Sequence, residues 1–259
     1  MKVVILCGGR GTRLREETEF KPKPMVEVGG RPLLWHIMHV YAHYGFREFV
    51  LCLGYKGHMI KEYFLNYEAM NNDFTVHLGN RNNVRVHGTH LENDWVVTLA
   101  DTGEDSMTGT RVKKIEKYVD GEDFMLTYGD GLANVNIGKL LAFHRSHGKV
   151  GTVTGVHPVS RFGELMIKDK AVVNFNEKPQ LKAGLINGGF FVFKRRFFRY
   201  LKAGKNQPLE AEPLERLTSG GELMVFKHDG FWQCVDTYRE FELLNSLWNT
   251  QKPPWRMDD

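Results

Sequence analysis

The segment Val3-Val4-Ile5-Leu6-Cys7, followed at once by Gly8-Gly9-Arg10-Gly11-Thr12-Arg13-Leu14, decides the fold of this chain. Its five apolar residues predict a buried central strand. The glycines that follow predict a loop that can adopt positive φ and bring backbone N–H groups close to a ligand. Cationic side chains surround this loop, at Arg10, Arg13, Lys21 and Lys23. A strand that leads into a glycine-rich, cationic loop is typical of phosphate sites in α/β proteins.

Two widespread phosphate-binding motifs do not match this loop. The dinucleotide fingerprint G-x-G-x-x-G can start at Gly9 and Gly11, but Leu14 stands where its third glycine should be. The loop G-x-x-x-x-G-K-[ST] of kinases and ATPases has no match here. The missing third glycine argues against a dehydrogenase. A tight turn in an ordinary parallel sheet remains the structural alternative to a phosphate site.

Apolar periodicity predicts the elements that follow the loop. Residues 32–44 and 56–66 predict helices, because their apolar side chains recur at three- and four-residue spacing. Residues 49–53 and 96–100 predict buried strands. This alternation predicts an α/β fold, a Rossmann-like, mostly parallel mixed sheet flanked by helices, with its ligand at the C-terminal ends of the strands. The polar segment 74–90 predicts a small β excursion, either a protruding hairpin or a loop.

The composition is that of an ordinary globular protein. The chain has 259 residues, a net charge of +4, 42% hydrophobic residues and 25% charged residues, which fits one large α/β domain. Basic runs at 111–114 and 194–196 are more typical of solvated surfaces than of a nucleic-acid groove. No stretch approaches the roughly 18 apolar residues of a membrane span, and the N-terminal apolar run is too short for a signal peptide. We therefore expect a cytoplasmic protein that binds neither nucleic acid nor membrane.

Cysteine and histidine side chains that could bind metal have simpler explanations. The cysteines are odd in number, unclustered and set in apolar surroundings, which predicts reduced thiols. The histidines follow one face of the first predicted helix, but no carboxylate at matching spacing supports a metal site, so we expect an exposed or interface stripe. We likewise expect the tail 253–255 at the surface or at a subunit contact. These side chains are Cys7, Cys52, Cys234, His36, His39 and His43.

Polar residues follow two further predicted strands. Ser106, Gly109 and Arg111 lie before or within the first turn of a helix predicted to run to about residue 119, which suits an anion or a ribose, or an ordinary helix cap. Asp130 lies between glycines directly after the strand 124–127. Because Mg²⁺ prefers one or two carboxylates together with phosphate oxygens and waters, Asp130 suits such an ion, although a simple turn aspartate is the alternative.

A second carboxylate precedes the last predicted helix. Asp236 follows the strand predicted at 231–235, and Thr237 with Glu240 forms the pattern of a capping box. Asp236 is therefore either a second metal ligand or a helix-entry carboxylate.

Several short motifs then occur in a fixed order along nearly the whole chain. Gly8-Gly9-Arg10-Gly11-Thr12-Arg13-Leu14 and Lys21-Pro22-Lys23-Pro24-Met25 open the series. It continues with Tyr128-Gly129-Asp130-Gly131, Glu177-Lys178-Pro179, Asn187-Gly188-Gly189 and Val235-Asp236-Thr237. The series resembles the signature of the sugar-phosphate nucleotidyltransferases. Within that family, the stretches 23–30, 101–109 and 230–233 are most similar to cytidylyltransferases that act on glucose 1-phosphate.

The resemblance implies one nucleotidyltransferase domain over 1–259, with a nucleotide-binding part at about 1–135 and a sugar-phosphate-binding part at about 136–259. It implies Mg²⁺-dependent transfer of a nucleotidyl group from CTP to glucose 1-phosphate, with release of pyrophosphate. The product CDP-glucose would supply deoxysugar and surface-polysaccharide synthesis, O-antigen included. CTP and glucose 1-phosphate would be the partners, together with further copies of the chain in a homo-oligomer such as a hexamer.

The resemblance also implies roles for the residues that match the family motifs. Arg13 and Lys23 would be catalytic, and Asp130 with Asp236 would hold Mg²⁺. The nucleotide would be bound by Leu6, Cys7, Gly8, Gly9, Arg10, Gly11, Thr12, Arg13, Lys23, Ser106, Arg111 and Gly129. The sugar phosphate would be bound by Tyr128, Gly163, Glu177, Lys178, Asn187 and Gly188.

Two other functions stay open at this point. The first is a sister transferase that uses UTP, dTTP or another sugar phosphate, because Cys7 departs from the alanine and Thr110 from the glycine more usual at these positions. The second is a non-catalytic sensor of nucleotide sugars. The intact set of Arg13, Lys23, Asp130 and Asp236 argues against a sensor, which has no need to keep metal ligands.

Overall fold

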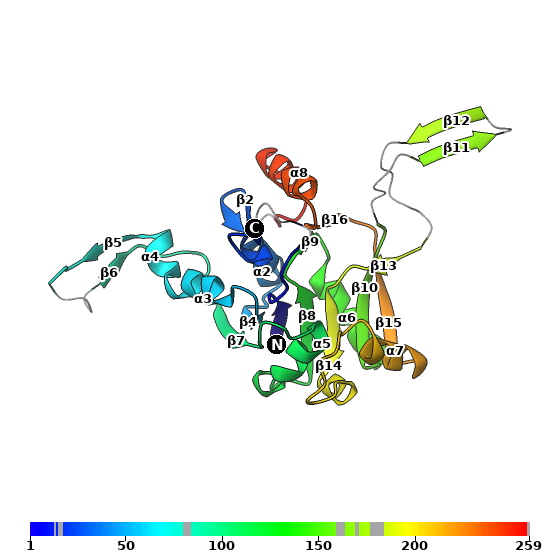
Figure 1. The fold of residues 1–259 in the computed structure, drawn as a ribbon, viewed down its shortest axis with the longest axis horizontal. Helices are drawn as coiled ribbons and strands as arrows, with labels where there is room; N and C mark the ends of the chain where they lie inside the picture. The colour runs from blue at the N-terminus through cyan, green and yellow to red at the C-terminus, as the bar shows by residue number, and fades with distance from the viewer. Residues whose placement is uncertain are drawn as a thin grey trace.

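A mixed sheet of eight strands forms the centre of the molecule (Figure 1). The computed structural model describes residues 1–12, 14, 18–79, 84–158, 164–168, 171–176 and 184–257. Along the sheet, the strands are β10 (Gly151–Val156), β14 (Phe191–Lys194), β8 (Asp123–Tyr128), β1 (Lys2–Leu6), β4 (Glu48–Leu53) and β7 (Val96–Asp101), while β13 (Ile186–Asn187) and β15 (Leu223–His228) also pair with β10.

The direction of the strands divides the sheet into two parts. β1 runs parallel to both β4 and β8, and β4 runs parallel to β7. β14 runs antiparallel to β8 and to β10, which makes the sheet mixed. The predicted fold class, a mostly parallel sheet flanked by helices, is therefore confirmed.

Helices cover both faces of this sheet (Figure 1). They are α2 (Leu33–His43), α3 (Gly57–Leu65), α4 (Tyr67–Asn71), α5 (Thr108–Lys114), α6 (Ile137–His147), α7 (Glu212–Ser219) and α8 (Tyr238–Asn249), together with the 3-10 helices η1 (Lys23–Met25), η2 (Glu116–Tyr118) and η3 (Arg195–Tyr200). The helix expected to run from the Ser106 region to about residue 119 is in fact two elements, because α5 ends before Ile115 and η2 follows it.

Successive residues of β1 enter two different hydrophobic cores. Val3 and Ile5 pack with residues of α2, α6 and α8, whereas Val4 and Leu6 pack with residues of α5, α7 and η3. Side chains alternate between the faces of a strand, so a strand buried on both faces must be apolar throughout. Each such side chain stabilises the fold by roughly 2 kcal/mol. This double burial fixes the position of the glycine-rich loop that follows β1.

Small two-stranded ladders lie outside the main sheet. The expected excursion at 74–90 contains β5 (Asp73–Val76) and β6 (Val84–His87), an antiparallel pair that projects from the body (Figure 1). A second projecting pair consists of β11 (Glu164–Lys168) and β12 (Ala171–Asn176). The remaining ladders are β2 (Glu27–Val28) with β3 (Arg31–Pro32), and β9 (Gly131–Ala133) with β16 (Trp232–Cys234).

His36 and the C-terminal tail are more buried than expected, whereas His43 is exposed as expected. His36 is 2% exposed and Trp255 is also 2% exposed, so the expectation of surface positions is wrong for both. The Nε2 of His36 donates to the carbonyl of Val28 at 2.8 Å, and the Nε1 of Trp255 donates to Nδ1 of His36 at 3.4 Å. Burial lowers the pKa of His36 to about 4, which keeps the ring neutral.

Among the residues that the structure describes, no helix combines the length and the apolar character that crossing a membrane requires.

Candidate active site

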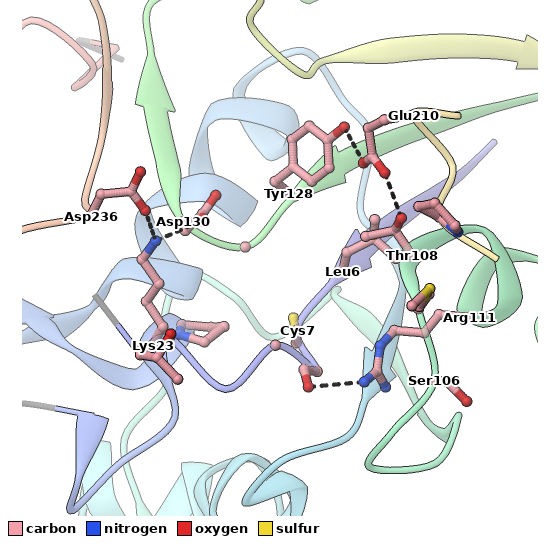
Figure 2. A pocket seen from close by; sticks show the side chains of 18 residues that line it. Leu6, Cys7, Lys23, Ser106, Thr108, Arg111, Tyr128, Asp130, Glu210 and Asp236 are labelled. Carbon is pink, nitrogen blue, oxygen red and sulfur yellow. Dashed lines mark hydrogen bonds and ion pairs between the residues drawn. The ribbon is translucent and has the colours of Figure 1, made fainter. Parts of the chain in front are cut away.

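A cavity of about 530 Å³ opens where β1 and β8 end, at the C-terminal edge of the parallel strands (Figure 2). This is the edge at which parallel α/β sheets bind their ligands. Its lining residues are Leu6, Cys7, Gly8, Gly9, Gly11, Thr12, Lys23, Pro24, Ser106, Met107, Thr108, Arg111, Tyr128, Gly129, Asp130, Pro208, Glu210 and Asp236.

Two glycines are required by the backbone geometry of this wall. The N–H of Gly129 donates to the carbonyl of Leu6 at 3.0 Å, and a Cβ on Gly129 would lie 2.8 Å from that same oxygen. Gly11 has φ of 62°, in the left-handed region that favours glycine. The glycines therefore let β1 and β8 approach each other and let the loop turn into the cavity.

Lys23 joins two aspartates that are far apart in the sequence. Its ammonium Nζ lies 2.8 Å from Oδ2 of Asp130 and 2.7 Å from Oδ1 of Asp236 (Figure 2). The side chains of Lys23 and Asp236 are 9% and 11% exposed, whereas that of Asp130 is 35% exposed and faces the cavity. Burial alone would lower the pKa of Lys23, but the two carboxylates outweigh it and raise that pKa above its ordinary value. The ammonium is therefore charged at neutral pH.

A short β ladder and a helix cap bring the two aspartates together. β16 pairs with β9 so that Cys234 faces Gly131, and the N–H of Val235 donates to the carbonyl of Asp130 at 2.8 Å. Beyond the ladder, Oε2 of Glu240 accepts from the N–H of Asp236 at 2.6 Å and from that of Thr237 at 2.8 Å. The predicted capping box of α8 is thus confirmed, and it also fixes the backbone of Asp236.

Arg111 holds the glycine-rich loop from behind. Its guanidinium donates to the carbonyls of Gly8, Leu53, Gly103 and Glu104 and to the hydroxyl of Thr102, at 2.8 to 3.0 Å. The residue is 4% exposed, and burial lowers its pKa from the usual value. Because its donors are used by neutral protein acceptors, Arg111 positions the loop in this structure. Direct contact of Arg111 with a nucleotide remains a prediction.

The opposite wall contains a residue that sequence reasoning missed. Glu210 accepts hydrogen bonds from the hydroxyls of Tyr128 and Thr108, each at 2.7 Å (Figure 2). The hydroxyl of Tyr128 also accepts from Nδ2 of Asn187 at 3.1 Å. These contacts bring the expected sugar-phosphate residues Tyr128 and Asn187 together at the edge of the nucleotide cavity. Thr108, a hydroxyl that the sequence placed near an anion or a ribose, also lines the cavity, and Pro208 is a further lining residue that the sequence did not single out.

Some predicted site residues lie beside the cavity or outside the described chain. Arg10 pairs with Asp105 at 2.9 Å and with Glu104 at 3.5 Å, so its guanidinium is bound at the surface rather than in the cavity wall. Gly188 does not line the cavity, and its carbonyl accepts from Nε1 of Trp232 at 2.8 Å. The other predicted residues, Arg13, Gly163, Glu177 and Lys178, lie outside the described residues.

The cavity can bind and neutralise an anion but offers no thiol nucleophile. Burial raises the pKa of the Cys7 thiol well above its usual value, so the group is protonated. Cys7, Cys52 and Cys234 are all free thiols, as expected. In the described part of the chain, no group of three or more histidine, cysteine or acidic side chains converges.

Comparisons with known proteins show the family of this chain. The family model described as "Nucleotidyl transferase" matches residues 2–247. The chain is 49% identical over 257 residues to glucose-1-phosphate cytidylyltransferase of Salmonella typhimurium, covering 99% of each chain. It is 30% identical over 246 residues to the mannose-1-phosphate guanylyltransferase catalytic subunit beta of Dictyostelium discoideum, covering 93% of this chain and 62% of that one.

A solved structure shares the fold. HddC from Yersinia pseudotuberculosis superposes with a TM-score of 0.68 at 22% identity, over 95% of this chain and 99% of that chain. The family model spans nearly all of the chain, and the residues around the glycine-rich loop form one cavity with a lysine and two aspartates. The chain therefore belongs to the nucleotidyl transferase family of enzymes.

Proposed function

We propose that this protein transfers a cytidylyl group from CTP to α-D-glucose 1-phosphate, giving CDP-glucose and pyrophosphate. A phosphate oxygen of glucose 1-phosphate attacks the α-phosphorus of CTP. The bond from that phosphorus to the oxygen that bridges to the β-phosphate breaks, and pyrophosphate leaves with the electron pair. The relative at 49% identity over 99% of both chains supports the choice of base and sugar.

One observation carries the proposal: Asp130 and Asp236 converge on the ammonium of Lys23 beside the glycine-rich loop. Phosphoryl and nucleotidyl transfers need alignment and neutralisation of charge rather than a protein nucleophile. Lys23 is a buried, charged ammonium that could be shared between the two carboxylates and an incoming phosphate. Gly9 and Gly11 of the loop line the same cavity. Backbone N–H groups of such glycine-rich loops suit phosphate oxygens.

The aspartates fit a magnesium ion. Both aspartates bond to one Nζ atom, at 2.8 and 2.7 Å, so two of their carboxylate oxygens lie close together. Two carboxylates that converge in this way, with phosphate oxygens and waters completing the shell, are the donor set that Mg²⁺ prefers. When bound, the ion would neutralise charge on the triphosphate. Lys23 would contact the sugar phosphate, and Glu240 would keep the backbone of Asp236 in place.

Further roles rest on the resemblance to the family. Arg13 would neutralise the leaving pyrophosphate, while Glu177 and Lys178 would face the sugar phosphate. The side chains of Tyr128 and Asn187 are hydrogen-bonded to each other at the rim of the cavity. This contact supports a sugar that binds at the rim. Free thiols at Cys7, Cys52 and Cys234 support the cytoplasm as its compartment.

The hairpin of β5 and β6 supports assembly into a homo-oligomer. Phe74, Val76 and Val84 are 48%, 43% and 49% exposed, and Leu78 at the turn is 88% exposed. Apolar side chains gathered on a projecting element are typical of surfaces that a partner covers. A second copy of the chain is the partner that we propose.

Pyrophosphate release tests the proposal. Purified protein with Mg²⁺ and glucose 1-phosphate would be offered CTP, UTP, dTTP, ATP and GTP separately. We expect clear preference for CTP. Preference for another nucleotide would show that the protein transfers that nucleotidyl group and not a cytidylyl group. If no nucleotide gave pyrophosphate, the proposed activity would be contradicted.

A further inference from the structure

Glu210 lies in the wall of the active-site cavity, on the segment between η3 and α7, and outside every motif that indicated the site. Both oxygens of its carboxylate are used. Oε1 accepts from the hydroxyl of Tyr128 and Oε2 accepts from that of Thr108, each at 2.7 Å (Figure 2). Tyr128 belongs to β8 and Thr108 to the first turn of α5, so this carboxylate joins two walls of the cavity.

The backbone that leads to Glu210 is held on the first turn of α5. The N–H of Thr110, one of the donors that a helix leaves without a partner in its own backbone, donates to the carbonyl of Gln207 at 3.2 Å. Gly109 permits this close approach, because a Cβ there would lie 3.0 Å from the same carbonyl oxygen. The position of the carboxylate is therefore fixed by the backbone as well as by its own hydrogen bonds.

The direction of each hydrogen bond in this network follows from the carboxylate. A carboxylate only accepts, so the hydroxyl of Tyr128 must donate to Glu210. The same hydroxyl then accepts from Nδ2 of Asn187 at 3.1 Å, and Oδ1 of Asn187 accepts from the N–H of Gly189 at 2.9 Å. Burial, and next the charge of Glu210, raise the pKa of Tyr128 above its ordinary value, so the hydroxyl keeps the proton that it donates. Glu210 thus sets the orientation of the Asn187 amide.

The charge of Glu210 indicates which part of the substrates lies along this wall. Among the described residues, its partners are the two hydroxyls, and no lysine or arginine lies at ion-pair distance. Phosphate groups are repelled by a carboxylate. A hexose is neutral, and its hydroxyls both donate and accept, as does the amide of Asn187. This wall therefore suits the sugar ring better than either phosphate.

We propose that Glu210 is a positioning residue for the sugar: through Tyr128 it holds the amide of Asn187 in the orientation that binds a hydroxyl of glucose 1-phosphate. The inference rests on the proposed function, because it assigns the sugar of that reaction to this wall. Binding groups must be held in their productive geometry by the residues behind them. Glu210 supplies that support without contact to the substrate.

Replacing the carboxylate by a side chain that cannot accept tests the proposal. Glu210→Leu should raise the KM for glucose 1-phosphate roughly tenfold, while kcat and the KM for CTP change less than about twofold. Glu210→Gln keeps one acceptor oxygen and should lie between this variant and the wild type. Glu215→Leu, at an exposed position of α7, is the matched control and should keep all three constants. An unchanged KM for glucose 1-phosphate in Glu210→Leu, or a rise in the KM for CTP alone, would overturn the proposal.

A double-mutant cycle tests whether Glu210 acts through Tyr128. Tyr128→Phe removes the hydroxyl that connects Glu210 to Asn187, so it should also raise the KM for glucose 1-phosphate. Adding Glu210→Leu to Tyr128→Phe should then produce no further increase, because the connection is already broken. Two effects that multiply would show that Glu210 acts by another route and would contradict the positioning role.

Calorimetric binding of CDP-glucose and of CDP gives a readout without turnover. Glu210→Leu should bind CDP-glucose roughly tenfold more weakly than the wild type and CDP equally well, because the two ligands differ in the sugar. Equal weakening for both ligands would overturn a role specific to the sugar. A wild-type protein that releases no pyrophosphate would overturn the proposed function together with this inference. An active wild type with an unchanged Glu210→Leu variant would overturn this inference alone.

Discussion

The ammonium of Lys23 lies 2.7 Å from a carboxylate oxygen of Asp236, although 213 positions separate the two residues. Their meeting depends on the pairing of β9 with β16, which places Asp236 next to Asp130. No spacing pattern in the sequence encodes this distance, because a long-range ladder creates it. This cluster of one cation and two carboxylates is the chemical centre of the proposed reaction.

Replacing Lys23 tests that centre directly. Lys23→Met should lower the rate of pyrophosphate release by at least about 100-fold, because a preorganised cation is lost where phosphate charge must be neutralised. Lys21→Met is the matched control, since Lys21 forms an exposed pair with Glu27 at 3.1 Å. Steady-state rates at saturating CTP measure the effect. A Lys23→Met protein that keeps more than about a tenth of the wild-type rate would contradict the role.

Removing metal or one of its proposed ligands should stop the reaction. Chelation with EDTA is expected to abolish turnover, and added Mg²⁺ should restore it. Asp130→Asn should raise the Mg²⁺ concentration for half-maximal rate by at least about tenfold, because a carboxylate ligand becomes a weaker amide ligand. Asp105→Asn, at an exposed position beside the cavity, is the control. An unchanged Mg²⁺ requirement in Asp130→Asn would rule out Asp130 as a ligand.

Arg111 and Arg10 should differ in their effect on stability. Arg111→Ala leaves several buried carbonyls without a donor, so it should lower the free energy of unfolding by about 3 kcal/mol. Arg10 is exposed and paired with Asp105, so Arg10→Ala should cost less than about 1 kcal/mol. Urea denaturation followed by circular dichroism measures both. An equal decrease in the free energy of unfolding for both variants would show that the contacts of Arg111 do not stabilise the loop.

Stability should fall as the pH is lowered from about 6.5 toward 4. Burial lowers the pKa of His36 and of His144 to about 4, below the ordinary value of 6.5. In this window the unfolded chain binds protons that the folded chain excludes, so protonation favours unfolding. His36 alone should cost roughly 3 kcal/mol once the pH reaches about 4.

Urea midpoints at several pH values measure this effect. His36→Gln should flatten the dependence, because Gln carries no titrating group. The matched control is His43→Gln at an exposed position on the same helix, which should leave the dependence as it is. A His36→Gln protein with the wild-type pH dependence would show that another group is responsible.

A charge on the hairpin should disrupt the proposed homo-oligomer. Phe74→Glu places a carboxylate on the β5 strand, where burial against a second copy would be unfavourable. Sedimentation velocity should show a smaller assembly than for the wild-type chain. Leu243→Glu, at a 44% exposed position on α8, is the control and should keep the wild-type mass. Unchanged mass in Phe74→Glu would place the contact elsewhere.

Short sequence patterns predicted those parts of the fold that depend on interactions between neighbouring residues. The apolar run of β1, the glycines after it and the capping box of Thr237 with Glu240 are all confirmed, because each depends on neighbouring residues. Asp130 and Asp236 were identified through the family resemblance, but their convergence on Lys23 required the tertiary structure.

Residues outside regular patterns escaped prediction for a physical reason. Glu210 precedes α7 in an irregular segment, and only the folded chain brings it to Tyr128. His36 was expected at the surface because the periodicity of one helix does not reveal what covers its polar side. The rings of Trp248 and Trp255 lie 4.9 and 6.1 Å from that of His36 and bury it.

The ladder between β9 and β16 also has a consequence during protein synthesis. Lys23 and the glycine-rich loop leave the ribosome early, whereas Asp236 follows 213 residues later, directly after the last strand. A nascent chain that stops before this point contains the parallel strands β1, β4, β7 and β8, yet its lysine has only Asp130 as a partner. A chain that stops before Asp236 therefore lacks one of the two carboxylates proposed to hold magnesium.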